Sequence, residues 1–349
     1  MGDLILYLGI TLVGYILGSR LRSVRQNLGW TGKVQLVALV ILVLMMGMRM
    51  GSNEEVTANI STIGVSAFLM TVVIMSFSVA AIWLARHVMK IDRYGRLQNG
   101  KTAAEAEKAP EQTMEISQEE SVAKSPAEAE AAEEAAEEEK KGGNSTTIAI
   151  LVSVVIGMVL GYVVIRRAFA GNMDTFDSLA GLGIKIGLCL LLIFVGMDLG
   201  LEGTVIDNFR KVGLRILVFP AAVIVGTLGG ALLCSLFMDL SVKECLAIGA
   251  GFGWYSLAPG IIMEKGYVTA SAVSFLHNVM RELFSIVLIP VVAKKIGYIE
   301  TTGMPGAAAM DVCLPIVEKS TRSDIAVYSF VSGVFLSILV PVLVPVIIG

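Results

Sequence analysis

Long, uninterrupted hydrophobic runs dominate the sequence from end to end. Eight of them approach or exceed the length that crosses a bilayer as a helix, at residues 4–18, 34–50, 63–85, 147–165, 179–199, 212–237, 267–293 and 325–348. Because the runs are continuous and do not alternate with polar residues, they argue against a β-barrel. The first run lacks a basic segment before it, so we interpret it as a span and not as a cleavable signal peptide. The pattern predicts an all-α polytopic membrane protein with eight transmembrane helices.

Two further hydrophobic stretches, at residues 246–263 and 303–317, are broken by glycine and proline. If the first stretch crossed the membrane, the helix after it would carry Lys294 and Lys295 to the outside, whereas basic residues favour the cytoplasm. The second stretch is too short to span. We therefore predict that both are re-entrant, broken-helix hairpins, which a membrane protein tolerates where the backbone lines a cavity.

Charge orients the chain and separates it into regions. Basic residues follow the first and third runs, which predicts cytoplasmic loops there and both termini outside. The whole chain has a net charge of −3, but residues 102–140 hold 13 Glu and 3 Lys, a net −10, and so the remainder carries about +7. Too few apolar residues are present in that acidic stretch to form a core. We expect a three-span bundle at 1–90, a disordered cytoplasmic linker at 91–145 and a transport bundle at 146–349.

Short glycine motifs recur in the two halves of the sequence. Residues 14–18 (GYILG) resemble 157–161 (GMVLG), and residues 46–51 (MGMRMG) resemble 195–200 (VGMDLG). The first three runs and the next three would then be related in opposite orientations. Inverted repeats with broken helices that meet near the midplane are typical of secondary transporters.

Polar residues interrupt the run at 267–293 near its middle. Asn278, Arg281 and Glu282 lie there, and a charge at the bilayer centre costs about 2.5–3.5 kcal/mol or more. With Ser271, Ser274 and Ser285 they recur every three or four positions and form a stripe on one side of a helix. Neighbours in sequence point in different directions from a helix, so Arg281 and Glu282 are expected to have separate partners. An ion pair that only joins two helices is the alternative.

The peptide 250–260 (AGFGWYSLAPG) is the most unusual in the chain. Its candidate substrate-binding residues are Gly251, Gly253, Trp254, Tyr255 and Ser256. The glycines allow the backbone to bend or to approach a ligand closely, and the aromatic rings offer faces to a cation. Ser241 and Glu244 have the spacing of a helix capping box just before it. A helix kink with interfacial aromatic residues is the alternative.

Asp311 lies inside the second broken stretch. A carboxylate in hydrocarbon needs a cation, a proton or water, so Asp311 and Glu282 are the two acidic residues that we place near the midplane. A structural cap of the hairpin is the alternative for Asp311. His277 is either a proton relay or a packing residue, and Asp198 and Arg49 are interpreted as interfacial. The four cysteines lack metal-ligand spacing and are expected to be buried hydrophobic residues, with no metal and no cofactor.

Three motifs in order, AGFGWYSLAPGIIME, NVMRELFSIVLIP and AAAMDVCLPIVEK, resemble the LysO lysine exporter family of bacterial inner membranes. The resemblance extends to the N-terminal spans and is most specific at residues 248–317. It implies export of L-lysine and toxic lysine analogues, with a pair of intramembrane acidic residues that falls on Glu282 and Asp311. The sequence departs from the family pattern after Leu257, where Ala-Pro-Gly stands, and at the acidic linker, which looks like an insertion.

We therefore expect a multi-pass inner-membrane protein that exports L-lysine by proton antiport, with sodium as the alternative coupling ion. No phosphate-binding loop of the G-x-x-x-x-G-K-[ST] type occurs, so ATP hydrolysis is not expected. The alternatives are an exporter of another basic amino acid, such as ornithine or arginine, and a cation channel. An intramembrane hydrolase is disfavoured because no nucleophile–base arrangement is visible. The lipid bilayer is the expected surrounding, nucleic acid is not a partner, and a homodimer stays open.

Overall fold

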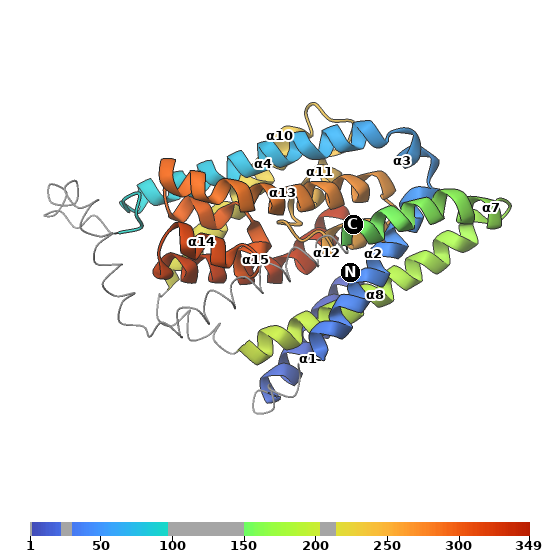
Figure 1. The fold of residues 1–349 in the computed structure, drawn as a ribbon, viewed down its shortest axis with the longest axis horizontal. Helices are drawn as coiled ribbons and strands as arrows, with labels where there is room; N and C mark the ends of the chain where they lie inside the picture. Colours follow the sequence, from blue (N-terminus) through green and yellow to red (C-terminus); the bar gives the residue numbers. More distant parts are fainter. Residues whose placement is uncertain (1, 22–29, 97–149, 203–213) are drawn as a thin grey trace, which may run out of the picture.

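The computed structural model describes residues 2–21, 30–96, 150–202 and 214–349, and across these ranges it contains helices and turns but no β-strand (Figure 1). Several predictions fall outside the described residues. These are the linker at 102–140, the basic residues between 22 and 29 and between 203 and 213, and the predicted starts of two runs at 147 and 212. The helical content of the rest confirms the all-α prediction.

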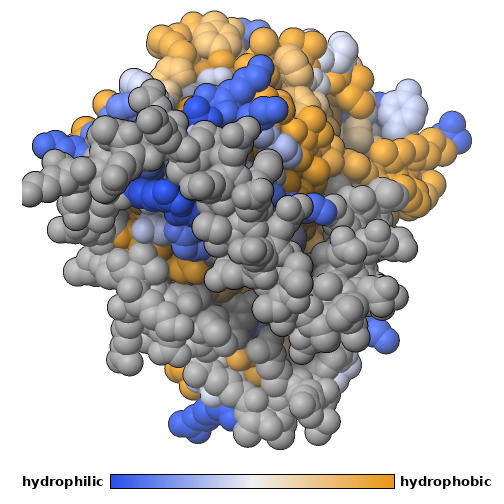
Figure 2. All heavy atoms as spheres, turned by 60° about the vertical axis from the view of Figure 1, so that its left-hand side comes forward, coloured by the Kyte–Doolittle hydropathy of each residue, from blue (hydrophilic) through white to orange (hydrophobic). Residues whose placement is uncertain are grey.

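Within the described ranges, six helices are long and apolar enough to cross a membrane. They are α2 (Thr31–Ser52), α4 (Ile60–Val88), Ile150–Ala168, α8 (Met173–Glu202), α13 (Val268–Lys295) and α15 (Ser323–Ile348). Two further apolar helices are shorter: Ile5–Arg20, which is the main part of α1 (Gly2–Arg20), and α10 (Val218–Cys234). Large apolar side chains such as Val225, Leu236 and Val287 are exposed on the outside, and hydrophobic patches are visible in Figure 2. This outward-facing apolar surface is that of a polytopic membrane protein.

The helices form two groups in space, and each group mixes the two halves of the sequence. In the first group, α1 and α2 pack on α8 and on the helix Ile150–Ala168. In the second, α4 packs on α10 and α13, with α15 beside them. The first group crosses below and to the right of the second in Figure 1. We call them the four-helix group and the broken-helix group, because both broken segments belong to the second.

Glycine pairs hold the four-helix group together. A Cβ atom at Gly14 or Gly18 of α1 would collide with the backbone of α8 at Ile193 or Met197, and one at Gly196 or Gly200 of α8 would collide with α1. The same holds between Gly47 and Gly51 of α2 and Gly157 and Gly161 of the helix Ile150–Ala168. Small residues four positions apart let helix backbones approach closely in membranes. The first helix of each half therefore packs on the second helix of the other half.

The first broken segment consists of α11 (Val242–Gly249), a turn at 250–256 and α12 (Leu257–Glu264). α11 opens with the predicted capping box, since Ser241 accepts from the Glu244 amide and Glu244 accepts from the Ser241 amide. It ends beside the middle of α10, where Gly249 lies against Thr227 and Ala231. α12 then leads back along the first turn of α13, where Ser271 Oγ donates to the Pro259 carbonyl at 2.7 Å.

The second broken segment consists of η5 (Ile299–Gly303), η6 (Gly306–Met310) and α14 (Leu314–Ser320). It starts beside the end of α4, where Arg86 Nε donates to Glu300 Oε1 at 2.6 Å in a buried ion pair. It then continues inward, where Gly303 lies against Ile82 of α4 and Val223 of α10. η6 packs on α15, and Ser329 Oγ donates to the Ala309 carbonyl at 2.8 Å.

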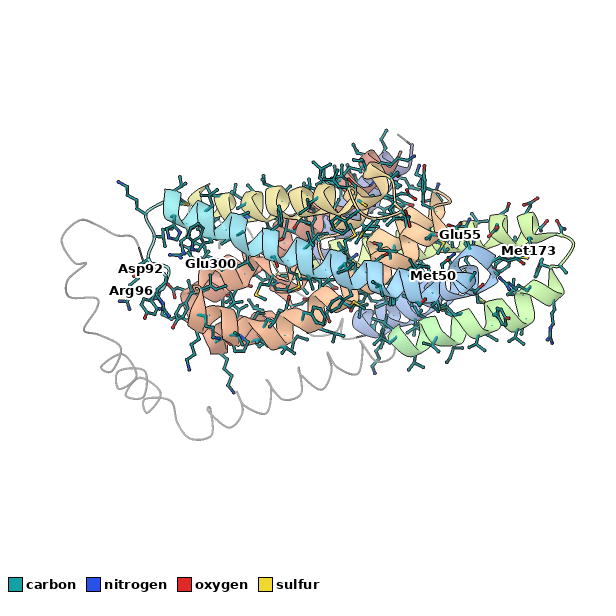
Figure 3. The ribbon with its side chains drawn as sticks, turned by 90° about the horizontal axis from the view of Figure 1, so that it is seen from above. Met50, Glu55, Asp92, Arg96, Met173 and Glu300 are labelled. Carbon is teal, nitrogen blue, oxygen red and sulfur yellow. The ribbon has the colours of Figure 1, made fainter. Side chains whose placement is uncertain are left out.

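The molecule has two chemically different ends (Figure 3). Asp92, Arg96 and Glu300 lie at one end, and Met50, Glu55 and Met173 lie at the other. We call the first the basic end, since it gathers Arg93, Arg96, Lys294, Lys295 and Arg322, and Arg93 donates to the Lys294 carbonyl at 2.8 Å. We call the second the Glu55 end. Arg166 lies there against the usual charge bias because it donates to the Ser52 carbonyl at 3.1 Å and to Thr57 Oγ1 at 2.9 Å.

Candidate functional site

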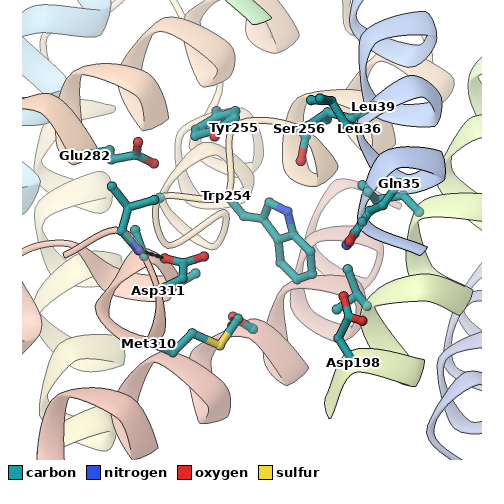
Figure 4. A pocket seen from close by; sticks show the side chains of 18 residues that line it. Gln35, Leu36, Leu39, Asp198, Trp254, Tyr255, Ser256, Glu282, Met310 and Asp311 are labelled. Carbon is teal, nitrogen blue, oxygen red and sulfur yellow. Dashed lines mark hydrogen bonds between the residues drawn. The ribbon is translucent and has the colours of Figure 1, made fainter. Parts of the chain in front are cut away.

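A cavity of about 450 Å³ lies between the four-helix group and the broken-helix group (Figure 4). α2 and α8 form one wall, and both broken segments with α13 and α15 form the other. It is lined by Gly32, Gln35, Leu36, Leu39, Leu191, Val195, Asp198, Gly253, Trp254, Tyr255, Ser256, Glu282, Ala307, Ala308, Met310, Asp311, Val312 and Ser337. Such a concave, mostly apolar site with a few polar groups is typical of small-molecule binding.

Three carboxylates line this cavity. Glu282 is 3% exposed and comes from the middle of α13, whereas Asp311 is exposed and follows η6. Asp198 comes from the last turns of α8 on the facing wall, near Gln35, and in Figure 4 the Trp254 ring lies between it and Asp311. No Lys, Arg or His is among the described residues that line the cavity. Its charged chemistry is therefore suited to a cation.

The turns of the two broken segments contact each other beside the cavity. The Ala307 amide donates to the Phe252 carbonyl at 2.7 Å. Gly253 (φ +93°) and Gly306 (φ +68°) adopt left-handed backbone conformations, and a Cβ at either would collide with the facing turn, at the Pro305 or the Phe252 carbonyl. The two segments thus reach the middle of the bundle from different sides and meet there through backbone groups.

Arg281 stabilises this junction on the side that does not line the cavity. The side chain is completely buried, and it donates from Nε to the Met304 carbonyl at 2.8 Å and from Nη2 to the Gly303 carbonyl at 3.1 Å. Those carbonyls belong to irregular backbone that has no helical partner to accept from, so a guanidinium is a suitable donor. The described contacts of Arg281 are with carbonyls and Thr227, while Glu282 faces the cavity. The two neighbours therefore point to different surroundings, as their spacing predicts.

The structure brings six of the nine predicted site residues to the cavity: Gly253, Trp254, Tyr255, Ser256, Glu282 and Asp311. The other three lie behind its wall: Gly251 and Asn278 shape the first turn, and Arg281 binds the second broken segment. Asn278 Oδ1 accepts from the Gly253 amide at 2.7 Å, and a Cβ at Gly251 would come within 2.7 Å of Ala258 Cβ. These three residues position the backbone next to the cavity and do not line it.

Asp198 and Gln35 line the cavity although the sequence did not single them out as site residues. In the sequence, Asp198 lies near the end of its hydrophobic run, which favours an interfacial position. An acidic residue inside an apolar run was the available signal, and it is the same signal that pointed to Glu282. Gln35 had no comparable signal, since a single amide near the start of a run is common at a membrane interface.

His277 does not line the cavity. It is fully buried against α4, with Nδ1 3.0 Å from Thr71 Oγ1. Cys234, Cys245 and Cys313 are buried and Cys189 is half-buried. Among the described residues, no group of three or more His, Cys, Asp or Glu side chains converges so that it could hold a metal ion. The carboxylates of the cavity are therefore spread over its walls and are not gathered around one point.

A second charged cluster lies at the Glu55 end of the boundary between the two groups. Arg49 of α2 donates to Asp177 at 3.1 Å and to the Met263 carbonyl at 2.8 Å, and Lys185 of α8 pairs with Glu264 of α12 at 3.1 Å. Tyr7 of α1 also donates to Glu264. We call this set the clamp, because it ties the end of α12 to α1, α2 and α8.

Comparison with known proteins identifies the family. The family described as Lysine exporter LysO matches residues 151–348, more than half of the chain. The chain belongs to the lysine exporter LysO family. Both broken segments and all cavity residues except those of α2 lie in the matched region. Lysine exporter family membership and the six long apolar helices make it a multi-pass protein of the bacterial inner membrane.

Two relatives show how far the lysine exporter similarity extends. The chain is 32% identical over 157 residues to Lysine exporter LysO of Escherichia coli K12, which covers 45% of this chain and 52% of that protein. It is 29% identical over 160 residues to a candidate lysine exporter of Haemophilus influenzae, covering 45% of this chain and 79% of that protein. The chain thus matches about half the length of the first relative. No solved structure matches it.

Proposed function

We propose that this chain is a secondary exporter of L-lysine or a closely similar basic amino acid. The observation that carries the proposal is the cavity, with acidic side chains on both walls, aromatic rings between them and no basic residue among its described lining. Lysine has two ammonium groups, and carboxylates and aromatic faces replace the water around an ammonium group. The names of the relatives point to the same substrate.

The helix arrangement supports eight membrane spans and two re-entrant hairpins. α10 and α11 are neighbours in the chain, and α11 stops halfway along α10, beside Thr227. The turn after it meets the middle of α13 at Asn278, and α12 then returns to the clamp at the Glu55 end. The second broken segment leaves and rejoins the basic end in the same manner, through Glu300 and α14. These paths fit two re-entrant hairpins that each reach halfway across the membrane, one from each side.

Crosswise glycine packing supports an inverted repeat. The first helix of each half packs on the second helix of the other half through matching glycine pairs. The third helices, α4 and α10, pack on each other, and Ser78 Oγ lies 2.9 Å from Thr227 Oγ1 between them. Two copies of a three-helix unit related by a pseudo-two-fold axis would produce these pairings. Such an axis in the membrane plane is typical of alternating-access transporters.

The cavity and the clamp, at opposite ends of the boundary between the two helix groups, support an inward-facing state. The cavity lies beside the first turns of α2 and the last turns of α8, away from the Glu55 end, and its Asp311 side chain is exposed. At the Glu55 end the clamp joins the two groups. With the basic end in the cytoplasm, the cavity loads lysine from inside. Release then requires the clamp to open.

Proton exchange is the proposed energy source. Glu282 and Asp311 alternately hold the substrate cation and protons, so lysine leaving outward frees a carboxylate that an incoming proton neutralises. The test uses purified protein in proteoliposomes loaded with lysine and given an imposed pH gradient, inside alkaline. We expect saturable lysine efflux that is accelerated by the gradient and accompanied by proton uptake. Efflux driven by a sodium gradient, and not by the pH gradient, would identify sodium as the coupling ion. High conductance in planar bilayers would indicate a channel. An absence of lysine flux under all gradients would contradict the export proposal.

A further inference from the structure

The cavity differs from an ordinary amino-acid site in one chemical respect. An amino acid has a carboxylate, and binding sites for it commonly supply a basic side chain or several backbone amides. The described lining of this cavity contains carboxylates, aromatic rings and amide or hydroxyl groups, but no Lys, Arg or His. Arg281, the nearest basic residue in sequence, is engaged with the Gly303 and Met304 carbonyls. Recognition at this site therefore depends on the ammonium groups of the ligand more than on its carboxylate.

The acidic side chains are also placed on two different structural units. Glu282 and Asp311 belong to the broken-helix group, whereas Asp198 belongs to α8 of the four-helix group, beside Gln35 of α2. The spread of these carboxylates, which do not converge as metal ligands, excludes a compact ion as the best fit for all three. The Trp254 ring lies between the two walls in Figure 4. A chain of methylene groups with a cation at each end would place its apolar middle against this ring.

We propose that Asp198, assisted by Gln35, forms a second ammonium subsite, so that the cavity selects linear molecules with two ammonium groups and binds diamines as well as lysine. The inference rests on the proposed function for the identity of the cavity as the transport site, and extends it to a further ligand class. 1,5-Diaminopentane has the same five-carbon separation between nitrogens as lysine and lacks the carboxylate. It is therefore the direct probe of a site that reads two ammonium groups.

The first experiment measures equilibrium binding to the detergent-solubilised full-length protein by calorimetry. The probes are 1,5-diaminopentane, 1-aminopentane and L-norleucine, which share a five-carbon chain or its amino-acid equivalent but differ in the number of ammonium groups. We expect the diamine to bind about tenfold or more tightly than either single-ammonium probe, the scale of one hydrogen bond to a charged group. Equal binding of the diamine and 1-aminopentane would overturn the inference.

The second experiment assigns the selectivity to Asp198. Asp198→Asn should weaken diaminopentane binding about tenfold while changing 1-aminopentane binding by less than about twofold, because only the two-ammonium ligand loses a charged contact. Asp174→Asn is the matched control, since Asp174 lies in the first turn of the same helix, is exposed and is far from the cavity. Gln35→Leu should produce a smaller loss in the same direction. An equal loss for both probes in Asp198→Asn would assign the residue to packing and overturn the inference.

Failure of the inference and failure of the proposed function are separable. Wild-type protein that moves lysine in proteoliposomes but shows no preference for the diamine retains its export function and loses the two-ammonium subsite. Wild-type protein that prefers the diamine in an Asp198-dependent way but does not move lysine retains the subsite and loses the proposed substrate. If Asp198→Asn does not fold, the comparison of probes on the wild-type protein and the Gln35→Leu variant still decide the result.

Discussion

The cavity and the clamp occupy different ends of the same boundary between helix groups, and both are built from charged side chains. In the clamp, each acid has a basic partner: Asp177 pairs with Arg49, and Glu264 pairs with Lys185. In the cavity, three acids share a lining in which the described residues include no base. The ion pairs of the clamp join two parts of the protein, whereas the described lining of the cavity carries charges of one sign, which suits a cationic ligand. The two charged sites thus differ in the balance of acidic and basic side chains that they present.

The largest expected effect concerns the two cavity acids of the broken-helix group. Glu282→Gln and Asp311→Asn keep size and hydrogen bonding but remove the charge. Each should abolish gradient-driven lysine efflux while leaving the protein folded, because Asp311 is exposed and a neutral amide at buried position 282 is less costly than an ion. Efflux and proton uptake in proteoliposomes are the measurements, and Glu318→Gln, an exposed residue of α14, is the control. Normal lysine-dependent proton uptake in either variant would remove that residue from the mechanism.

The next effect concerns Arg281, the buried charge that donates to two backbone carbonyls. Arg281→Met leaves the Gly303 and Met304 carbonyls without this donor in a buried place, and each unsatisfied group costs about 1–3 kcal/mol. The unfolding temperature in detergent should fall clearly, and Arg281→Lys should recover part of the loss. Lys295→Met, at the exposed end of the same helix, should unfold as the wild type does. An unchanged unfolding temperature for Arg281→Met would show that the junction does not depend on the guanidinium.

A moderate effect is expected at the aromatic face of the cavity. Replacing both Trp254 and Tyr255 by Leu should weaken lysine binding by about 1–2 kcal/mol, since cation–π contacts at partly desolvated sites are of this size. Calorimetric binding of lysine is the measurement, and Phe237→Leu, an exposed aromatic residue away from the cavity, is the control. Unchanged lysine affinity in the folded double variant would assign the rings to packing.

The smallest effect is expected at the clamp. Glu264→Gln removes the ion pair with Lys185, whose side chain is 33% exposed, and such partly exposed pairs contribute about 1 kcal/mol or less. The variant should therefore increase the population of the outward-open state only a few-fold, which is the change that an energy of this size produces. A cysteine placed at buried Ser271, behind α12, should react faster with a membrane-impermeant reagent from outside in this variant. Glu244→Gln is the control, because Glu244 caps α11 and has no part in the clamp. No change in labelling would show that the clamp does not gate the boundary.

Much of the fold was predictable from hydrophobic periodicity alone. Run length predicted every long helix because a lipid-facing helix must be apolar for about 20 residues, and glycine and proline marked both broken segments because they end helices. The glycine motifs predicted a relation between the two halves, and the Ser241–Glu244 spacing predicted a cap that the structure contains. These are local signals, written within a few residues of the feature that they describe.

The sequence by itself determined that the chain is an all-helical membrane protein, that Glu282 and Asp311 are expensive to bury, and that Arg281 and Glu282 point to different surroundings. Only the tertiary structure decided that Arg281 binds carbonyls twenty-odd residues further along the chain and that Asp198 shares a cavity with the other two acids. The physical reason is that burial cost depends on residue type, which a sequence shows directly. The partner that offsets this cost depends on which helices pack side by side, and α8 meets the first broken segment because α12 packs on α8 and the clamp joins the two groups there.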